Sequence, residues 1–123
     1  MFIYLAGPYG HTNQAIAHAR FCVHEDAAVV MMLSGDVVFS PIMHWHRVSM
    51  ERGIDTTPDF WENYNQKMVS ACSLLRVLDL PGLEKSRGTA AEIGWASMRK
   101  IPVEIYSPHD LEAYKHFEKT LCG

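Results

Sequence analysis

Strand patterns and helix patterns alternate along this chain of 123 residues. Short apolar runs predict strands at residues 2–6, 36–40, 73–78 and 103–106. Helices are predicted from Thr12 or Asn13 to Ser34-Gly35, from Pro58, across residues 90–99, and after Ser107, Pro108 and Asp110. This order predicts a three-layer α/β sandwich with a mainly parallel sheet. Because the length suits one compact unit, we expect residues 1–123 to form a single domain.

The helix expected after Thr57-Pro58-Asp59 has proline at a favoured first position. Its spacing predicts a buried face of Phe60, Tyr64, Met68 and Ala71. Residues 41–57, which precede it, are expected to be a long irregular segment over the sheet edge, where loops commonly carry function.

Two of the predicted strands run into turns of small residues. Gly7, Pro8, Tyr9 and Gly10 follow the first strand directly, and Ser86-Arg87-Gly88-Thr89 comes shortly after the third. The carboxyl ends of parallel strands meet at one edge of the sheet, so both turns, together with Asp79, are expected to border one crevice.

Glu92 lies about one turn inside the helix that follows Ser86. Helical side chains lean toward the helix N-terminus, so this carboxylate is expected to reach back toward the turn. Backbone N–H groups at such a turn suit a phosphate or a sugar, and a carboxylate beside a bound sugar can attack it. The alternative is a capped surface helix with an ordinary glutamate near its start.

With these motifs in order, the chain resembles the nucleoside 2-deoxyribosyltransferase superfamily, which includes the 2'-deoxynucleoside 5'-phosphate N-hydrolases. The resemblance rests on residues 4–9 (YLAGPY), on Ser86-x-Gly88-Thr89-x-x-Glu92-Ile93-Gly94 and on Lys100-x-Pro102-Val103. It spans residues 2 to about 106 and implies a flavodoxin-like sheet, homo-oligomers whose pockets are completed by a neighbouring subunit, and no cofactor.

The resemblance also implies roles for individual residues. Glu92 matches the catalytic carboxylate, and its place near a helix N-terminus is expected to keep it ionised. Tyr4, Gly7, Pro8 and Tyr9 match the turn that shapes the sugar and base pocket. Gly88 and Thr89 match the backbone beneath the sugar.

Ser86 is the position that discriminates between substrates. Relatives that act on free nucleosides tend to carry an acidic residue here, whereas those that act on 5'-monophosphates tend to carry serine. A hydroxyl can donate to a phosphate that a carboxylate would repel. Ser86, with Arg87 beside it, therefore favours a 5'-monophosphate.

One position departs from the pattern of the superfamily. An aspartate that helps to protonate the leaving base is usual in the helix before the third strand, but an ungapped match places Tyr64 there, with Asn65 adjacent. Asparagine can donate a hydrogen bond but is not an acid at neutral pH. Asp59 or Asp79 is expected to take over this role, or activation of the leaving group is weak.

His44, Trp45 and His46 stand in the long segment after the second strand. Trp45 can stack on a base while His44 or His46 binds the edge of that base; alternatively, Trp45 packs on the sheet and both histidines are solvated. A metal site at His44-x-His46 has no convincing further ligand, so no metal is expected. The remaining histidines, at positions 11, 18, 24, 109 and 116, are expected to be solvated.

Composition excludes several classes of protein. A net charge of −3 argues against polymeric DNA or RNA as a partner, and the longest apolar stretch, residues 27–33, is too short to span a membrane. Three widely spaced cysteines do not suggest a disulfide framework, and the first 30 residues do not resemble a signal peptide. We therefore expect a cytoplasmic protein.

The sequence thus predicts an enzyme that cleaves the N-glycosidic bond of a nucleoside or deoxynucleoside 5'-monophosphate, by hydrolysis or by base transfer. The alternative is a non-catalytic nucleotide-binding domain. The implied partners are a small nucleotide or nucleoside and further copies of the chain, as a dimer or tetramer. Large apolar residues give independent support for assembly, because such groups are enriched in interfaces: Met31, Met32, Trp45, Trp61, Trp95 and Met98.

Overall fold

The computed structural model describes residues 1–52 and 58–122, apart from the side chains of residues 58, 59 and 122. Its elements follow one another along the chain as β1 (Phe2–Ala6), α1 (Gln14–Leu33), β2 (Val37–Phe39), α2 (Pro41–Arg52), α3 (Pro58–Ala71), β3 (Leu74–Leu78), the short 3-10 helix η1 (Leu83–Lys85), α4 (Arg87–Met98), β4 (Val103–Tyr106) and α5 (Glu112–Cys122).

The four strands form one sheet in the order β2-β1-β3-β4, and every neighbouring pair is parallel. The register pairs Tyr4 with Phe39 on one side and with Leu75 on the other. The prediction of a mainly parallel α/β sheet is confirmed. The strand order turns back on itself at β1 and β3, and such a switch point opens a crevice above the carboxyl ends of the strands.

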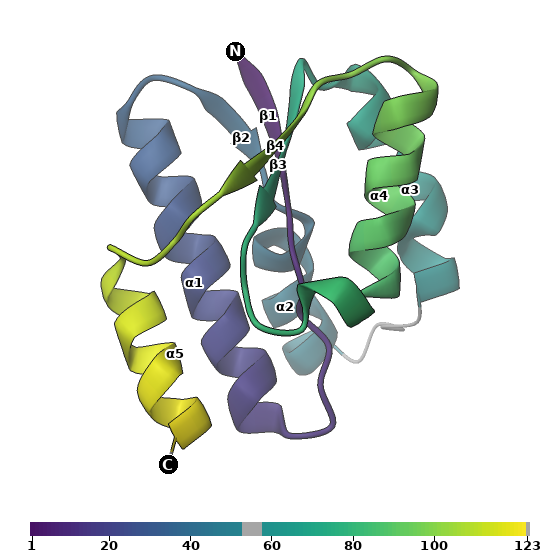
Figure 1. Cartoon of the computed structure of the whole chain (residues 1–123). Helices are drawn as coiled ribbons and strands as arrows, with labels where there is room; N and C mark the ends of the chain where they lie inside the picture. Colours follow the sequence, from purple (N-terminus) through teal and green to yellow (C-terminus); the bar gives the residue numbers. More distant parts are fainter. Residues whose placement is uncertain (53–57, 123) are drawn as a thin grey trace.

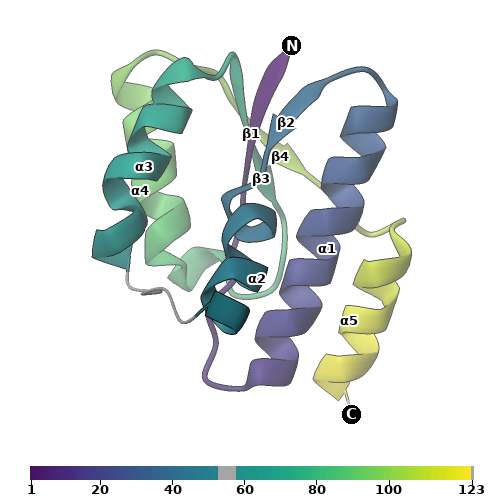
Figure 2. The ribbon, with the colours of Figure 1, turned by 180° about the vertical axis from the view of Figure 1, so that it is seen from behind.

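Helices cover both faces of the sheet. Helices α1 and α5 pack together on one face, and α3 and α4 pack together on the other (Figure 1). Figure 2 shows α2 below the carboxyl end of β2, between α1 and the α3–α4 pair. Alternation along β1 sends Ile3 and Leu5 into the core beside α1, and Tyr4 and Ala6 into the core beside α4.

The expectation of an irregular segment is wrong for residues 41–52, which form helix α2. Pro41 occupies its first position, where a missing N–H leaves no helical hydrogen bond unmade. The Ser40 hydroxyl caps the helix by accepting from the Met43 N–H at 3.1 Å. Residues 53–57, including Thr57, lie outside the described residues.

The predicted buried face of α3 is wrong at three of its four positions; only Met68 is partly buried and packs against the core. Phe60 and Tyr64 are 51% and 41% exposed, and Ala71 is exposed, whereas Val69 is fully buried. The inward face includes Trp61 and Asn65, one position further along the chain than expected. Apolar residues occur on both sides of this helix, so packing against the sheet decided which side is buried.

Within the described residues, no helix has the length and apolar character needed to cross a membrane.

Candidate active site

The turn before α4 is built on Ser86. Its side chain caps the helix, accepting from the Thr89 N–H at 3.3 Å, and its hydroxyl lies 2.8 Å from the hydroxyl of Thr89. Helix α4 therefore begins at Arg87, three residues before the predicted start. The N–H groups of the first turn face the same end of the helix as the Ser86 hydroxyl, which favours an anion there.

Glu92 is the buried acid of this site, with only 8% of its surface exposed. Tyr4, which is fully buried on β1, donates its hydroxyl hydrogen bond to Glu92 Oε2. Burial raises the pKa of Glu92 to about 7, and the Tyr4 hydrogen bond opposes that rise. Burial and the neighbouring Glu92 charge raise the pKa of Tyr4, so its hydroxyl stays a donor.

The expectation that Glu92 is kept ionised by the helix N-terminus is therefore corrected. Desolvation outweighs the helix dipole, because little water reaches the carboxylate to stabilise its charge. A carboxyl with a pKa near 7 exists in both protonation states at neutral pH.

His24 on α1 forms a hydrogen bond to the turn after β1. This side chain is fully buried, so the expectation that it is solvated is wrong. Burial lowers the pKa of His24 to about 4, and the neutral ring donates from Nε2 to the Pro8 carbonyl at 3.2 Å. A Cβ at Gly7 would lie 2.9 Å from Leu78 and 3.0 Å from the His24 ring, so only glycine fits there.

Arg20 joins two loops at the same edge of the sheet, and sequence reasoning missed it. The residue is 8% exposed, and its guanidinium donates to the carbonyls of Gly10 at 2.8 Å and Pro81 at 3.1 Å. Gly82 has φ +96°, and a Cβ there would lie 2.6 Å from Arg20 Nη2. The sequence held one indication that Arg20 is buried: it lies on the helix face that also carries the apolar residues Ile16 and Val23.

Aromatic side chains of α2 and α3 form an aromatic wall in the same region. Trp45 of α2 stacks on Trp61 of α3, with ring centroids 3.5 Å apart and 24° between the planes, and it donates from Nε1 to Asn65 Oδ1 at 3.2 Å. His46 stacks on Phe21 at 4.1 Å and shares a hydrogen bond with the Tyr9 hydroxyl.

The two turns, Glu92 and the stacked tryptophans border one cleft of about 1040 Å³. Nine predicted site residues line it: Gly7, Pro8, Tyr9, Trp45, Ser86, Arg87, Gly88, Thr89 and Glu92. His46, the predicted alternative to His44 for binding the edge of a base, also lines it. Other lining residues had not been predicted as site residues, among them Arg20, Trp61, Glu62, Asn65, Lys85 and Trp95. The shared cleft joins both turns to the aromatic wall.

Three predicted residues do not line the cleft. Tyr4 reaches Glu92 from within the core. His44 is exposed and packs against Phe39 and Tyr64. Residues two positions apart on a helix point in different directions, so His44 points away from the cleft that His46 lines. The same geometry separates His44 from His46, and the described residues contain no group of three or more His, Cys, Asp or Glu side chains that could hold a metal ion.

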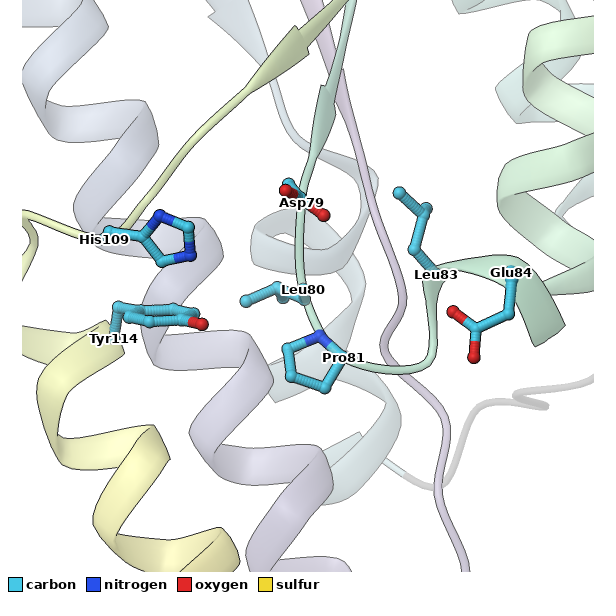
Figure 3. A pocket seen from close by; sticks show the side chains of 7 residues that line it. All are labelled: Asp79, Leu80, Pro81, Leu83, Glu84, His109 and Tyr114. Carbon is cyan, nitrogen blue, oxygen red and sulfur yellow. The ribbon is translucent and has the colours of Figure 1, made fainter.

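Asp79 is the third of these residues. It lines a separate hollow, with His109 and Tyr114 on the side of α5 and Leu80 and Pro81 beneath (Figure 3). The structure therefore does not bring Asp79 to the cleft, and the Asp59 side chain lies outside the described part.

The parallel sheet in the order β2-β1-β3-β4 is a flavodoxin-like α/β fold, as the sequence predicted. By sequence, the chain belongs to the family described as a domain of unknown function, DUF1937, whose family model matches residues 1–108. Among solved structures, that of Clostridium botulinum CMP N-glycosidase, BcmB, is similar over 100% of both chains, with a TM-score of 0.54 and 14% sequence identity. No curated protein matches the chain.

Proposed function

We propose that this protein cleaves the N-glycosidic bond of a nucleoside or deoxynucleoside 5'-monophosphate, with Glu92 as the nucleophile. The observation that carries the proposal is the Glu92 carboxyl, which is buried, bound by Tyr4 and open to a cleft that begins at a capped helix N-terminus. A structural site for a phosphate alone would gain nothing from a buried carboxylate near its ligand.

The first chemical step needs the ionised form of Glu92. One carboxylate oxygen forms a bond to the anomeric carbon while the bond from that carbon to the base breaks, and the electron pair leaves with the base nitrogen. Because the Tyr4 hydroxyl holds Oε2, the carboxylate is oriented before the substrate binds.

In the second step a water oxygen attacks the same carbon, the bond from that carbon to Glu92 breaks, and the carboxylate is released. The proton that the water loses balances the one that the departed base takes up. The products are then the free base and the sugar 5-phosphate. If a second base attacks in place of water, the reaction is a base transfer.

The α4 end of the cleft is suited to the phosphate. Ser86, Arg87 and Gly88 line it there, together with the N–H groups of the first helical turn. A Cβ at Gly88 would meet no protein atom within 4 Å, so packing does not require glycine at this position. Glycine leaves this part of the cleft open to a sugar phosphate.

The shared fold supports the proposal, because the similar solved structure is that of a CMP N-glycosidase. We also propose a homo-oligomer. A single chain exposes large apolar side chains that a second copy could cover: Phe60 and Tyr64 on α3, and Met98 at the end of α4. Of the six residues that the sequence suggested for an interface, Met31 is buried in the core and the three tryptophans line the cleft. Met32 and Met98 are exposed and remain candidates for the interface.

Base release from a panel of nucleotides tests the function. The full chain is incubated with ribo- and deoxyribonucleoside 5'-monophosphates and with the parent nucleosides, and free base is quantified by chromatography. Release from monophosphates that is abolished by Glu92→Gln supports the proposal. Binding of nucleotides without any release by the wild type would instead support the non-catalytic nucleotide-binding domain.

A further inference from the structure

Asn65 is a cleft residue whose amide has a defined orientation. Its Oδ1 accepts the hydrogen bond from Trp45 Nε1 at 3.2 Å. An indole N–H can only donate, so the atom that faces it must be the amide oxygen rather than the nitrogen. The chemistry of Trp45 therefore excludes the flipped amide.

The Trp45 indole is itself held on several sides. It stacks on Trp61, and the rings of His44 and Tyr64 contact it edge-on, at centroid distances of 4.2 Å and 4.6 Å. These contacts limit rotation of the indole, so the hydrogen bond to Asn65 has a fixed anchor. Tyr64 thus packs behind the wall of the cleft, while Asn65 lines the cleft itself.

The Asn65 Nδ2 group has no acceptor among the described residues of the chain. Since the oxygen is already occupied by Trp45, what Asn65 offers to a molecule in the cleft is a pair of N–H donors. Asn65 lies on α3, beside α4, which carries Glu92 in the same cleft.

We propose that Asn65 recognises the leaving base, and that it selects a 2-oxopyrimidine by donating to the carbonyl oxygen next to the glycosidic nitrogen. This inference rests on the proposed function. As the glycosidic bond breaks, its electron pair moves into the ring, and negative charge builds on that oxygen. An N–H donor stabilises this charge without transferring a proton, and the base takes its proton from water after it has left.

The same donor does little for a purine. Departure of a purine is helped by protonation of a ring nitrogen, and an amide cannot supply that proton at neutral pH. Tyr64 and Asn65 stand where the superfamily pattern has an aspartate, and this departure and the oriented amide point to the same class of base.

The test compares base preference in the wild type and in variants of the full chain. With uridine, cytidine, adenosine and guanosine 5'-monophosphates, the wild type is expected to favour the pyrimidines. Asn65→Ala should lower kcat/KM for pyrimidine nucleotides by about 10- to 100-fold and that for purine nucleotides by less than about threefold. Asn63→Ala, an exposed asparagine on the same helix, is the matched control and should change neither.

Two further variants separate donation from packing. Trp45→Phe keeps a ring but removes the indole N–H, so the amide can flip and part of the pyrimidine preference should be lost. Asn65→Asp replaces the donor by a carboxyl, so its pyrimidine rate, divided by that of the wild type at the same pH, should be low at pH 8 and rise as the pH is lowered and the carboxyl becomes a donor. A purely structural Asn65 would not produce that change in pH profile.

Binding distinguishes failure of this inference from failure of the proposed function. In the Glu92→Gln background, calorimetry should show tighter binding of uridine 5'-monophosphate than of adenosine 5'-monophosphate, and Asn65→Ala should abolish the difference. If the wild type releases base but Asn65→Ala affects both base classes equally, Asn65 does not select the base. If the wild type releases no base while the binding preference depends on Asn65, the selection stands and the catalytic proposal fails.

Discussion

Replacing Glu92 by glutamine is predicted to abolish turnover and to stabilise the fold at the same time. The pKa of Glu92 is raised from an ordinary value of 4.5 to about 7. Above pH 7, folding therefore keeps an ionised carboxylate in a site that disfavours its charge. The shift of 7 minus 4.5 corresponds to about 3 kcal/mol of lost stability. Glutamine removes this penalty and keeps an oxygen that can accept from Tyr4.

The size of this stabilisation depends on the pH. Between pH 7 and 4.5 the folded chain binds a proton at Glu92 that the unfolded chain does not, so wild-type stability rises as the pH falls. His24 acts in the opposite direction, because its pKa falls from 6.5 to about 4 on burial, and the folded chain resists the proton that the unfolded chain accepts. In the wild type, the contributions of Glu92 and His24 to the pH dependence of the free energy of unfolding oppose each other between about pH 4.5 and 6.5. Glu92→Gln leaves only the His24 slope.

Urea unfolding at a series of pH values measures this effect. At pH 8, Glu92→Gln should be more stable than the wild type by about 3 kcal/mol, or ~10 °C in Tm for a chain of this size. The gain should vanish near pH 4.5, and the variant should lose stability below pH 6.5 more steeply than the wild type. Glu62→Gln, which removes an exposed carboxylate of the same cleft, is the control and should show no such gain. Equal stability of wild type and Glu92→Gln at pH 8 would refute the desolvation argument.

Three other predictions concern the site and the assembly. Tyr4→Phe removes the hydrogen bond that lowers the pKa of Glu92, so the acidic limb of the kcat/KM profile should move to higher pH; an unchanged limb would show that Glu92 ionisation does not control the rate. Ser86→Asp keeps a good helix cap but should weaken binding of a 5'-monophosphate relative to its nucleoside by about 1–3 kcal/mol in calorimetry, and equal losses for both ligands would place the phosphate elsewhere. Light scattering at micromolar concentration should give a multiple of 13.9 kDa, and a monomer mass unchanged by nucleotide would contradict the homo-oligomer.

Local signals in the sequence were sufficient for much of the fold. The apolar run of residues 2–6 before Gly7-Pro8, the strand at residues 103–106 and the Asn13 cap all appear where they were expected. Each of these depends on neighbouring residues and on backbone preferences that are set within a few positions. Helix α2 was missed although Ser40-Pro41 is a start signal of the same kind, because residues 41–57 were interpreted as one irregular segment over the sheet edge.

By itself, the sequence determined the alternation of strands and helices, and hence a parallel sheet with two small-residue turns at its carboxyl edge. Only the tertiary structure decided which side of α3 lines the cleft, that His24 is buried, and that Tyr4 meets Glu92 across 88 positions of sequence. Desolvation depends on every atom that surrounds a group, and those atoms come from distant segments of the chain. The position of Glu92 could therefore be predicted from its motif, whereas its pKa could not.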